Sequence, residues 1–102
     1  MGEFNMNYQQ VWDSIVNQIK IINQNYVNSS NNPIPYPNGF VIQGMNLAAR
    51  FVFARKCIDF NNPSERDLFD KVIKDMVNQG YITEFKSGGI KLTQNGVTSF
   101  LP

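Results

Sequence analysis

Few side chains in this sequence could do chemistry, and those present exclude most kinds of enzyme site. The chain has no histidine, so it lacks the commonest general base and metal ligand. Its single cysteine, Cys57, has no histidine to activate it and is expected to fill space in the core. Gly88-Gly89 lacks the following helix and lysine of a phosphate-binding loop. We therefore predict a protein that is not an enzyme and that has neither a cofactor nor a metal site.

The charged side chains are nearly balanced, with nine Lys and Arg against eight Asp and Glu. A net charge of +1 creates no global field that would attract a polyanion, so any contact with nucleic acid must come from a local patch. The segment 63–79 carries three negative and two positive residues on its predicted outer face: Asp67, Asp70, Lys71, Lys74 and Asp75, with Asn78. Asp67 with Lys71 and Asp70 with Lys74 are four residues apart, which predicts two ion pairs along a helix.

The length of 102 residues is typical of one domain, and 42% hydrophobic and 17% charged residues are typical of a globular one. A lone cysteine forms no intrachain disulfide, and no apolar run approaches the ~18–20 residues of a membrane span. We therefore expect a cytoplasmic protein. Met1-Gly2-Glu3-Phe4 resembles a cloning remnant, so residues 1–5 are expected to be disordered and 6–102 to form the domain.

A long amphipathic helix is predicted over residues 7–27. Its apolar residues recur every three or four positions in one stripe: Tyr8, Val11, Trp12, Ile15, Val16, Ile19, Ile22, Tyr26 and Val27. Ile21 points out of this stripe. Two interpretations remain: the stripe is core packing, or part of it, with Ile21, forms a homodimer contact through helix 7–27.

The middle of the chain is predicted to change from loop to strand to helix. Residues 28–39 are rich in asparagine and proline and are expected to form an exposed loop. A short strand is predicted at 40–42, before Gly44. A helix is then predicted from Asn46, as its cap, to Ile58, and a strand around Val52 is the alternative. The expected core residues of this helix are Leu47, Phe51, Ala54 and Ile58, with Phe53 and Cys57 flanking them.

The last 40 residues carry the clearest local signals. Asn62 and Pro63 suit the cap and first position of a helix over 63–79, and Gly80 suits its left-handed stop. The apolar face of this helix is Leu68, Phe69, Val72, Ile73, Met76 and Val77. Residues 81–85 and 90–93 read as two strands of a hairpin that turns around Gly88-Gly89. Val97, Phe100 and Leu101 are expected to form a short closing helical turn. The fold class is therefore α+β.

This order resembles a winged helix-turn-helix domain of the kind found in bacterial MarR- and PadR-like transcriptional regulators. The resemblance lies in Val72, Met76 and Gly80-Tyr81-Ile82, followed by Gly88-Gly89-Ile90-Lys91-Leu92-Thr93, Gly96 and Phe100. It is similar to the family's run of helix, glycine, apolar residue, wing and Leu-Thr-x-x-Gly. The resemblance covers about 60 of the 102 residues well and the rest of the chain loosely.

The resemblance implies a small regulatory protein that binds duplex DNA, with helix 63–79 in the major groove and the 86–91 wing on the phosphates. Transferred by position, Ser64, Arg66, Lys71 and Lys74 would lie on the reading helix. Lys86, Ser87 and Lys91 would lie on the wing, and Arg50, Arg55 and Lys56 would contact the DNA backbone. Thr93 would cap the closing segment.

An alternative function is a winged-helix module for protein–protein interaction that does not bind nucleic acid. Its basis is the near-zero net charge, the acidic outer face of helix 63–79 and the apolar residues Ile34 and Tyr36 in the loop. Because one fold serves many functions, the fold alone does not decide between the two.

Overall fold

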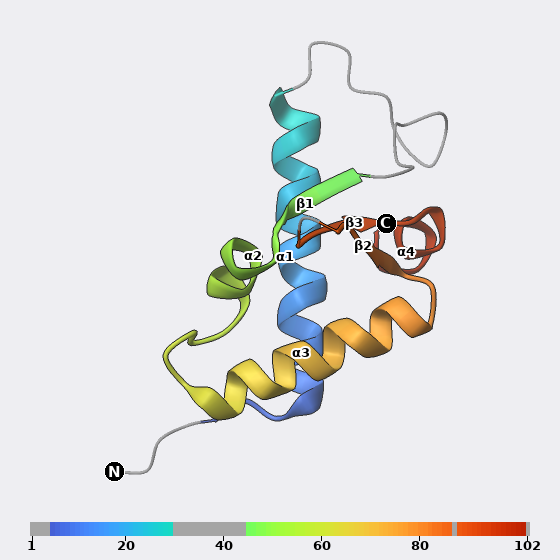
Figure 1. The fold of residues 1–102 in the computed structure, drawn as a ribbon. Coiled ribbons are helices and arrows are strands. Elements are labelled where there is room, and N and C mark those ends of the chain that lie inside the picture. Colours follow the sequence, from blue (N-terminus) through green and yellow to red (C-terminus); the bar gives the residue numbers. More distant parts are fainter. Residues whose placement is uncertain (1–4, 30–44, 87, 102) are drawn as a thin grey trace.

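Two long helices, α1 (Tyr8–Ser29) and α3 (Pro63–Asn78), cross near the N-terminal end of α1, and the sheet and the shorter helices lie further along α1 (Figure 1). The structure, a computed structural model, describes residues 5–29, 45–86 and 88–101. The elements follow the order α1 (Tyr8–Ser29), β1 (Met45–Ala49), α2 (Arg50–Cys57), α3 (Pro63–Asn78), β2 (Ile82–Glu84), β3 (Gly89–Leu92) and α4 (Gln94–Phe100). This is a small α+β domain whose hairpin lies near its C-terminus, in an order consistent with a winged helix.

Helix α1 begins at a reciprocal cap. The side-chain oxygen of Asn7 accepts a hydrogen bond from the Gln10 amide at 2.8 Å, and the Gln10 side chain accepts one from the Asn7 amide at 2.9 Å. The predicted stripe is confirmed from Tyr8 to Ile22, because Val11, Ile15 and Ile19 are fully buried and the other stripe residues there are partly buried against the core. The helix ends at Ser29, two residues beyond the predicted end.

Helix α3 begins and ends as its sequence predicts. The Asn62 side chain accepts hydrogen bonds from the amides of Ser64 and Glu65 at 2.9 and 3.3 Å. At the other end Gly80 has a φ of +83°, which is costly for residues with a Cβ atom. The Tyr81 amide then donates to the Met76 carbonyl, and the Gly80 amide to the Val77 carbonyl, in the pattern of a Schellman motif.

The predicted hairpin is confirmed, and a third strand joins it. Strand β3 lies between β1 and β2 and is antiparallel to both. Ile82 is opposite Leu92 in the hairpin, and Ala49 is opposite Gly89 at the other edge. Alternate residues of β3, Ile90 and Leu92, are fully buried, so this central strand turns one face to the core.

Helix α4 closes the core over the end of α3. The Thr93 hydroxyl accepts a hydrogen bond from the Gly96 amide at 3.0 Å, which confirms the predicted cap, and donates one to the Gly80 carbonyl at 2.6 Å. A Cβ atom on Gly96 would lie 2.1 Å from the Tyr81 carbonyl oxygen. The Leu-Thr-x-x-Gly run therefore ties α4 to the end of α3. Residue 96 must be glycine because the Tyr81 carbonyl leaves no room for a Cβ atom.

The predicted helix from Asn46 to Ile58 is wrong in its first third. Residues Met45–Ala49 form strand β1, because their backbone groups pair with β3, and α2 begins only at Arg50. The cap position is Ala49, and its side chain makes no capping hydrogen bond. The alternative of a strand around Val52 is also wrong, because that residue lies within α2. Tertiary pairing overrides the local helix propensity of residues 47–49.

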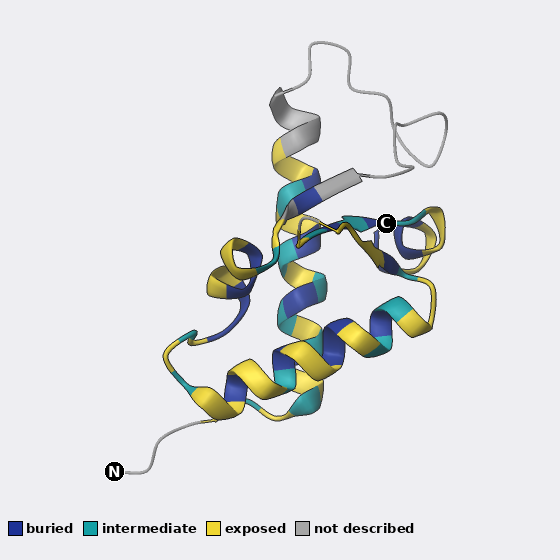
Figure 2. Ribbon diagram, in the orientation of Figure 1, coloured by how far each residue is buried: buried dark blue, intermediate teal, exposed yellow. Residues whose placement is uncertain are grey.

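Of the predicted core residues of this segment, Leu47, Ala54 and Ile58 are buried as expected, and Phe51 is not. Phe53, Ala54 and Cys57 are the buried residues of α2, whereas Phe51 is 54% exposed. Figure 2 shows the same contrast, with dark-blue turns along α1 and α3 and a largely yellow outer side on α2. The predicted strand at 40–42 and residues 30–39 of the predicted loop lie outside the described residues.

Candidate functional site

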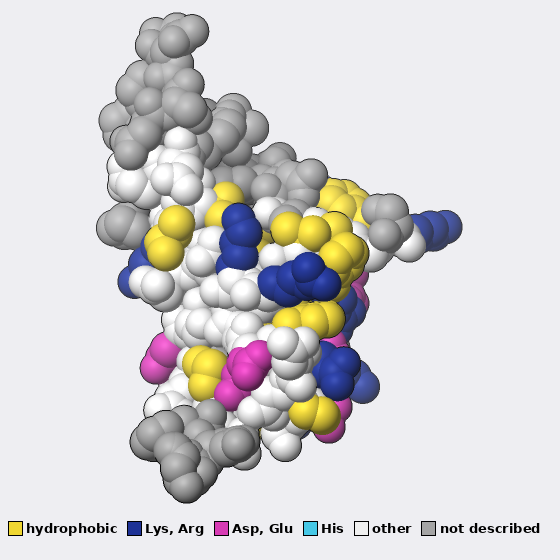
Figure 3. All heavy atoms as spheres, turned by 90° about the vertical axis from the view of Figure 1, so that its left-hand side faces the viewer, with side chains coloured by type: hydrophobic (Ala, Val, Ile, Leu, Met, Phe, Trp, Pro, Cys, Tyr) yellow, Lys and Arg dark blue, Asp and Glu magenta, His cyan; other side chains and the backbone are white. Residues whose placement is uncertain are grey.

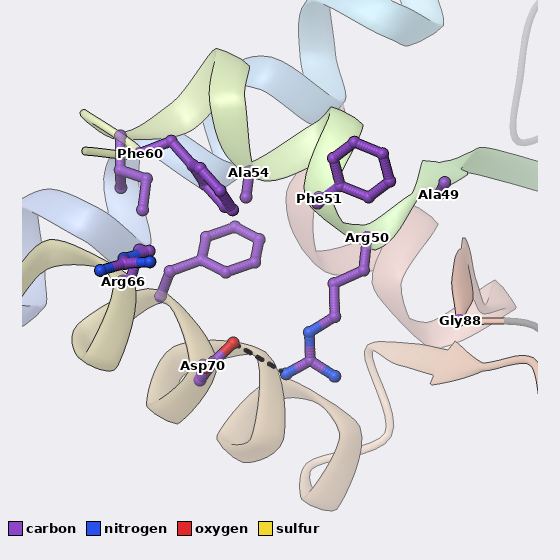
Figure 4. Close-up of a pocket in the computed structure, with 10 residues that line it drawn as sticks. Ala49, Arg50, Phe51, Ala54, Phe60, Arg66, Asp70 and Gly88 are labelled. Carbon is purple, nitrogen blue, oxygen red and sulfur yellow. Dashed lines mark hydrogen bonds and ion pairs between the residues drawn. The ribbon is translucent and has the colours of Figure 1, made fainter. Parts of the chain in front are cut away.

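An open groove of about 310 Å³ lies between α2 and α3. Helix α3 packs on α1, and it meets α2 where Phe53 lies against Phe69, with ring centroids 6.2 Å apart. Its lining is mainly apolar: Ala49, Phe51, Ala54, Ile58, Phe60, Phe69 and Gly88, with Arg50, Arg66 and Asp70 as the charged residues. Ala54, Ile58 and Phe69 are buried and form the floor, and Phe51 stands exposed at one side (Figure 4).

Two arginines lie against the aromatic rings of the groove. The Arg55 guanidinium carbon is 5.5 Å from the ring centroid of Phe51 and 5.4 Å from that of Phe60. Arg66, on the first turn of α3, lies 5.7 Å from the Phe60 ring. Such contacts contribute roughly 0.5–1 kcal/mol at exposed sites. The cluster Phe51, Arg55, Phe60 and Arg66 is called the aromatic–arginine cluster below.

Arg50 stands at the other end of the groove and links three elements. Its guanidinium pairs with Asp70 of α3 at 3.2 Å and also with Glu84 of β2. Its backbone amide donates to the Gly88 carbonyl of the hairpin turn at 3.0 Å. Arg50 therefore fixes α2 to α3 and to the hairpin, and two carboxylates neutralise its charge. Figure 4 shows its side chain reaching across the groove to Asp70.

The two ion pairs predicted along the outer face of α3 do not form. Asp70 pairs with Arg50, and Lys71 pairs with Asp75 at 3.8 Å. Among the described residues, neither Asp67 nor Lys74 has an ion-pair partner. The prediction for Asp70 failed because Arg50 of α2 binds its carboxylate. The spacing of residues along one helix cannot reveal a partner that lies on another helix.

Asp75 does not belong to the outer face either, because it is half-buried against α1. The Tyr8 hydroxyl donates a hydrogen bond to its carboxylate at 2.6 Å. This bond to a carboxylate, with burial and the nearby negative charge, raises the pKa of Tyr8 to about 12. Lys71 lies over the Tyr8 ring, 5.9 Å from its centroid, and so turns towards α1 rather than towards the groove.

The remaining predicted contact residues are spread over α2, α3 and the hairpin. Lys56, Ser64, Lys74 and Lys86 are exposed. Lys91 is half-buried, with its ammonium 5.4 Å from the Phe85 ring centroid. Ser87 lies outside the described residues. Figure 3 shows dark-blue basic side chains lying among yellow hydrophobic ones on the side of the molecule that carries α2.

Cys57 lies in the core, as predicted. It is 5% exposed, and desolvation raises the pKa of its thiol to about 12, so the thiolate is scarce at neutral pH. Its carbonyl oxygen accepts a hydrogen bond from the Ser14 hydroxyl at 2.5 Å, which ties α2 to α1. The burial and the α1 contact together assign Cys57 to packing.

In the described part of the chain, no three residues among Cys, Asp and Glu are grouped so that they could hold a metal ion. No helix in residues 5–29, 45–86 and 88–101 combines the length and apolar character needed to cross a bilayer. Comparison with known protein families, with curated proteins and with solved structures finds no match.

The groove residues Phe51 and Phe60 were not singled out by the sequence prediction as parts of a site. One signal was available for the first: Phe51 and Arg55 are four residues apart, so on a helix their side chains are neighbours. The second ring could not be found in this way. Phe60 follows the helix in a loop, and only the fold brings it under Arg55 and Arg66.

Proposed function

We propose that this chain is a winged-helix domain that binds duplex DNA through α3 and the hairpin wing. The order β1-β3-β2, with the hairpin directly after the glycine stop of α3, supports the winged-helix assignment. The hairpin turn is bonded to the start of α2 through Arg50, which also pairs with α3, so α2, α3 and the wing are linked as one unit. Such a unit could present its cations to the phosphates of one duplex.

The observation that carries this proposal is the distribution of unpaired cations. Of nine Lys and Arg, Arg50 and Lys71 are paired, which leaves seven without an ion-pair partner among the described residues. Six of these seven belong to the proposed unit, namely Arg55, Lys56, Arg66, Lys74, Lys86 and Lys91, and only Lys20 lies on α1. Cations without an intramolecular carboxylate partner can neutralise phosphates and release their counterions.

The test is a titration of a labelled random-sequence duplex, followed by fluorescence anisotropy at several salt concentrations. We expect binding at about 50 mM salt, with log affinity falling linearly as log salt rises. The variant with Lys86→Ala and Lys91→Ala should bind more weakly and reduce the salt slope by about one per lost phosphate contact. Lys20→Ala is the matched control on α1 and should leave the affinity unchanged. Absence of binding at about 50 mM salt would refute the proposal.

The second candidate is a protein-interaction module that does not bind DNA, and the groove face favours it. Two carboxylates neutralise Arg50, and Asp67 and Asp70 are exposed on α3, where they would approach phosphates. A partner protein whose binding survives Lys86→Ala with Lys91→Ala, in a chain that shifts no duplex, would support this function. Loss of partner binding in the same double variant would contradict it.

We also propose that the chain forms a homodimer through α1. Ile21 is 43% exposed on this helix, outside the buried stripe, which supports a contact there. Light scattering on the purified chain tests the idea. A dimer that becomes a monomer in Ile21→Glu is the expected result, and a monomer at all concentrations in the unaltered chain would contradict it.

A further inference from the structure

The groove between α2 and α3 holds more apolar surface than the fold uses. Its volume of about 310 Å³ lies at the lower end of the range for ligand pockets, roughly 300–1,000 Å³, so it suits one or two large side chains. Phe51 contributes an aromatic side chain that is 54% exposed, and Phe60 contributes a second ring. Exposed apolar surface of this kind, rimmed by charged residues, is typical of interaction sites.

The charge at the rim indicates the chemistry of the partner. Arg55 and Arg66 each lie within 6 Å of a ring centroid, and neither has a carboxylate within ion-pair distance among the described residues. Asp70 does line the groove, but its carboxylate is bound to Arg50. The aromatic–arginine cluster therefore offers two forked guanidinium groups that can each bind a carboxylate. The complementary partner carries negative charge beside an apolar group.

The floor of the groove decides between a peptide side chain and a nucleobase. Ala54, Ile58 and Phe69 supply only carbon atoms from their side chains. The edges of a base would lose their hydrogen bonds to water there and find no replacement, which is costly. A leucine, isoleucine or phenylalanine side chain has no such requirement. The lining thus favours an apolar anchor, and the arginines favour acidic neighbours of that anchor.

We propose that the groove is the docking site for a segment of a partner protein in which one bulky apolar side chain is flanked by aspartate or glutamate. The anchor side chain enters between Phe51 and Phe60, and the flanking carboxylates bind Arg55 and Arg66. The apolar lining of this site includes neither Lys86 nor Lys91 of the wing, so the site can be tested apart from the wing, although Arg55 and Arg66 are also among the cations proposed to contact DNA.

The experiment is selection of a randomised peptide library on the immobilised full chain. We expect enrichment of peptides in which a large apolar residue stands next to carboxylates. Binding of the enriched peptide, measured by anisotropy, should be at least about tenfold weaker for Phe51→Ala, as for an aromatic residue that carries binding energy. Phe85→Ala is the matched control, since Phe85 is also an exposed aromatic side chain but lies on the hairpin, and it should bind as the unaltered chain does.

A second pair of variants tests the charge. Arg66→Glu should weaken peptide binding about tenfold or more, whereas Lys20→Glu, the same reversal on α1, should not. Because Phe51 and Arg66 are exposed, both variants should keep the far-ultraviolet circular dichroism of the folded chain.

Three results would overturn the proposal: no enrichment of acidic and apolar peptides, equal binding by Phe51→Ala and the unaltered chain, or displacement of the peptide by a single-stranded oligonucleotide that itself requires Phe51. None of them depends on duplex DNA, so failure here and failure of the proposed function are distinguishable.

Discussion

Helix α3 has one closed side and one open side, and the two sides differ in how their polar and apolar groups are matched. On the closed side, Tyr8 of α1 donates to Asp75, and buried Glu65 accepts hydrogen bonds from the amides of Met6, just before α1, and Asp59, in the loop before α3. Against α2 an apolar groove stays open, where Arg55 lies over the Phe51 ring and Arg66 over the Phe60 ring. The closed side holds the fold together. The open side leaves surface that the fold does not need, which is why we place binding there.

Two phenylalanines of α2, one buried and one exposed, give the largest expected difference. Phe53 is fully buried against Phe69, with ring centroids 6.2 Å apart, so Phe53→Ala should lower the free energy of unfolding by about 3–5 kcal/mol. Phe51→Ala should cost less than about 1 kcal/mol, because it loses little beyond one cation–π contact. Urea denaturation of both variants gives the comparison. Equal costs would mean that Phe51 is part of the core and that the groove is closed in solution.

Glu65 lies on the closed side, in the first turn of α3, and is only 3% exposed. Its two carboxylate oxygens accept from the Asp59 amide at 2.9 Å and the Met6 amide at 3.2 Å. Glu65→Ala leaves both donors without this partner and should cost about 1–3 kcal/mol in urea denaturation. Asp67→Ala, at an exposed position two residues later, is the control and should change stability by less than about 0.5 kcal/mol. A similarly small loss of stability in both variants would show that the hydrogen bonds of Glu65 do not stabilise the closed side of α3.

The open side should respond more weakly, and the response should depend on salt. Arg50→Ala removes the link from α2 to Asp70 and Glu84, but these are partly exposed pairs, worth about 0.2–1 kcal/mol each. Thermal unfolding should show a small loss at low salt that fades near 1 M salt, where the Debye length is about 3 Å. A loss of the same size at both salt concentrations would indicate that Arg50 acts through packing of its aliphatic stem.

The smallest effect should appear at high pH, on the closed side. The pKa of Tyr8 is raised from 10.0 to about 12 in the folded chain, so its protonated hydroxyl contributes stability that is complete below pH 10. That contribution is lost as the pH rises through about 12. Cys57, with a pKa raised from 9.0 to about 12, acts in the same direction. Thermal unfolding between pH 9 and about 12 should therefore be less pH-dependent in Tyr8→Phe. An unchanged pH dependence would show that the bond to Asp75 does not govern the titration of Tyr8.

Much of the fold could be predicted because its signals are local. Asn62, Pro63 and Gly80 act on the backbone within one turn, and the apolar spacing of α1 and α3 is read along one helix. Strand β1 could not be predicted, since residues 45–49 have no strand signal of their own and pair only because β3 is there. For the same reason the partner of Asp70 was missed, as Arg50 is 20 positions away in sequence.

The candidate site was less predictable than the fold. Its basic residues were named from a resemblance, but the aromatic rings that accompany Arg55 and Arg66 were not. Phe51 was assigned to the core from its spacing, because the predicted helix began at Asn46. Once residues 45–49 are in the sheet, α2 buries Phe53 and Cys57 in the core, and Phe51 is left at the groove.

The sequence by itself determined where α1, α3 and the hairpin lie and where α3 starts and stops, because caps, glycine stops and helical periodicity act over a few residues. The tertiary structure alone decided which residues pair across elements: β1 with β3, Arg50 with Asp70 and Glu84, and Phe60 with Arg55 and Arg66. The contacts of β1 and Arg50 depend on distances that chain folding sets between positions far apart in sequence, and those of Phe60 depend on the path of the loop between α2 and α3. The groove, and with it the proposed binding site, belongs to this second class.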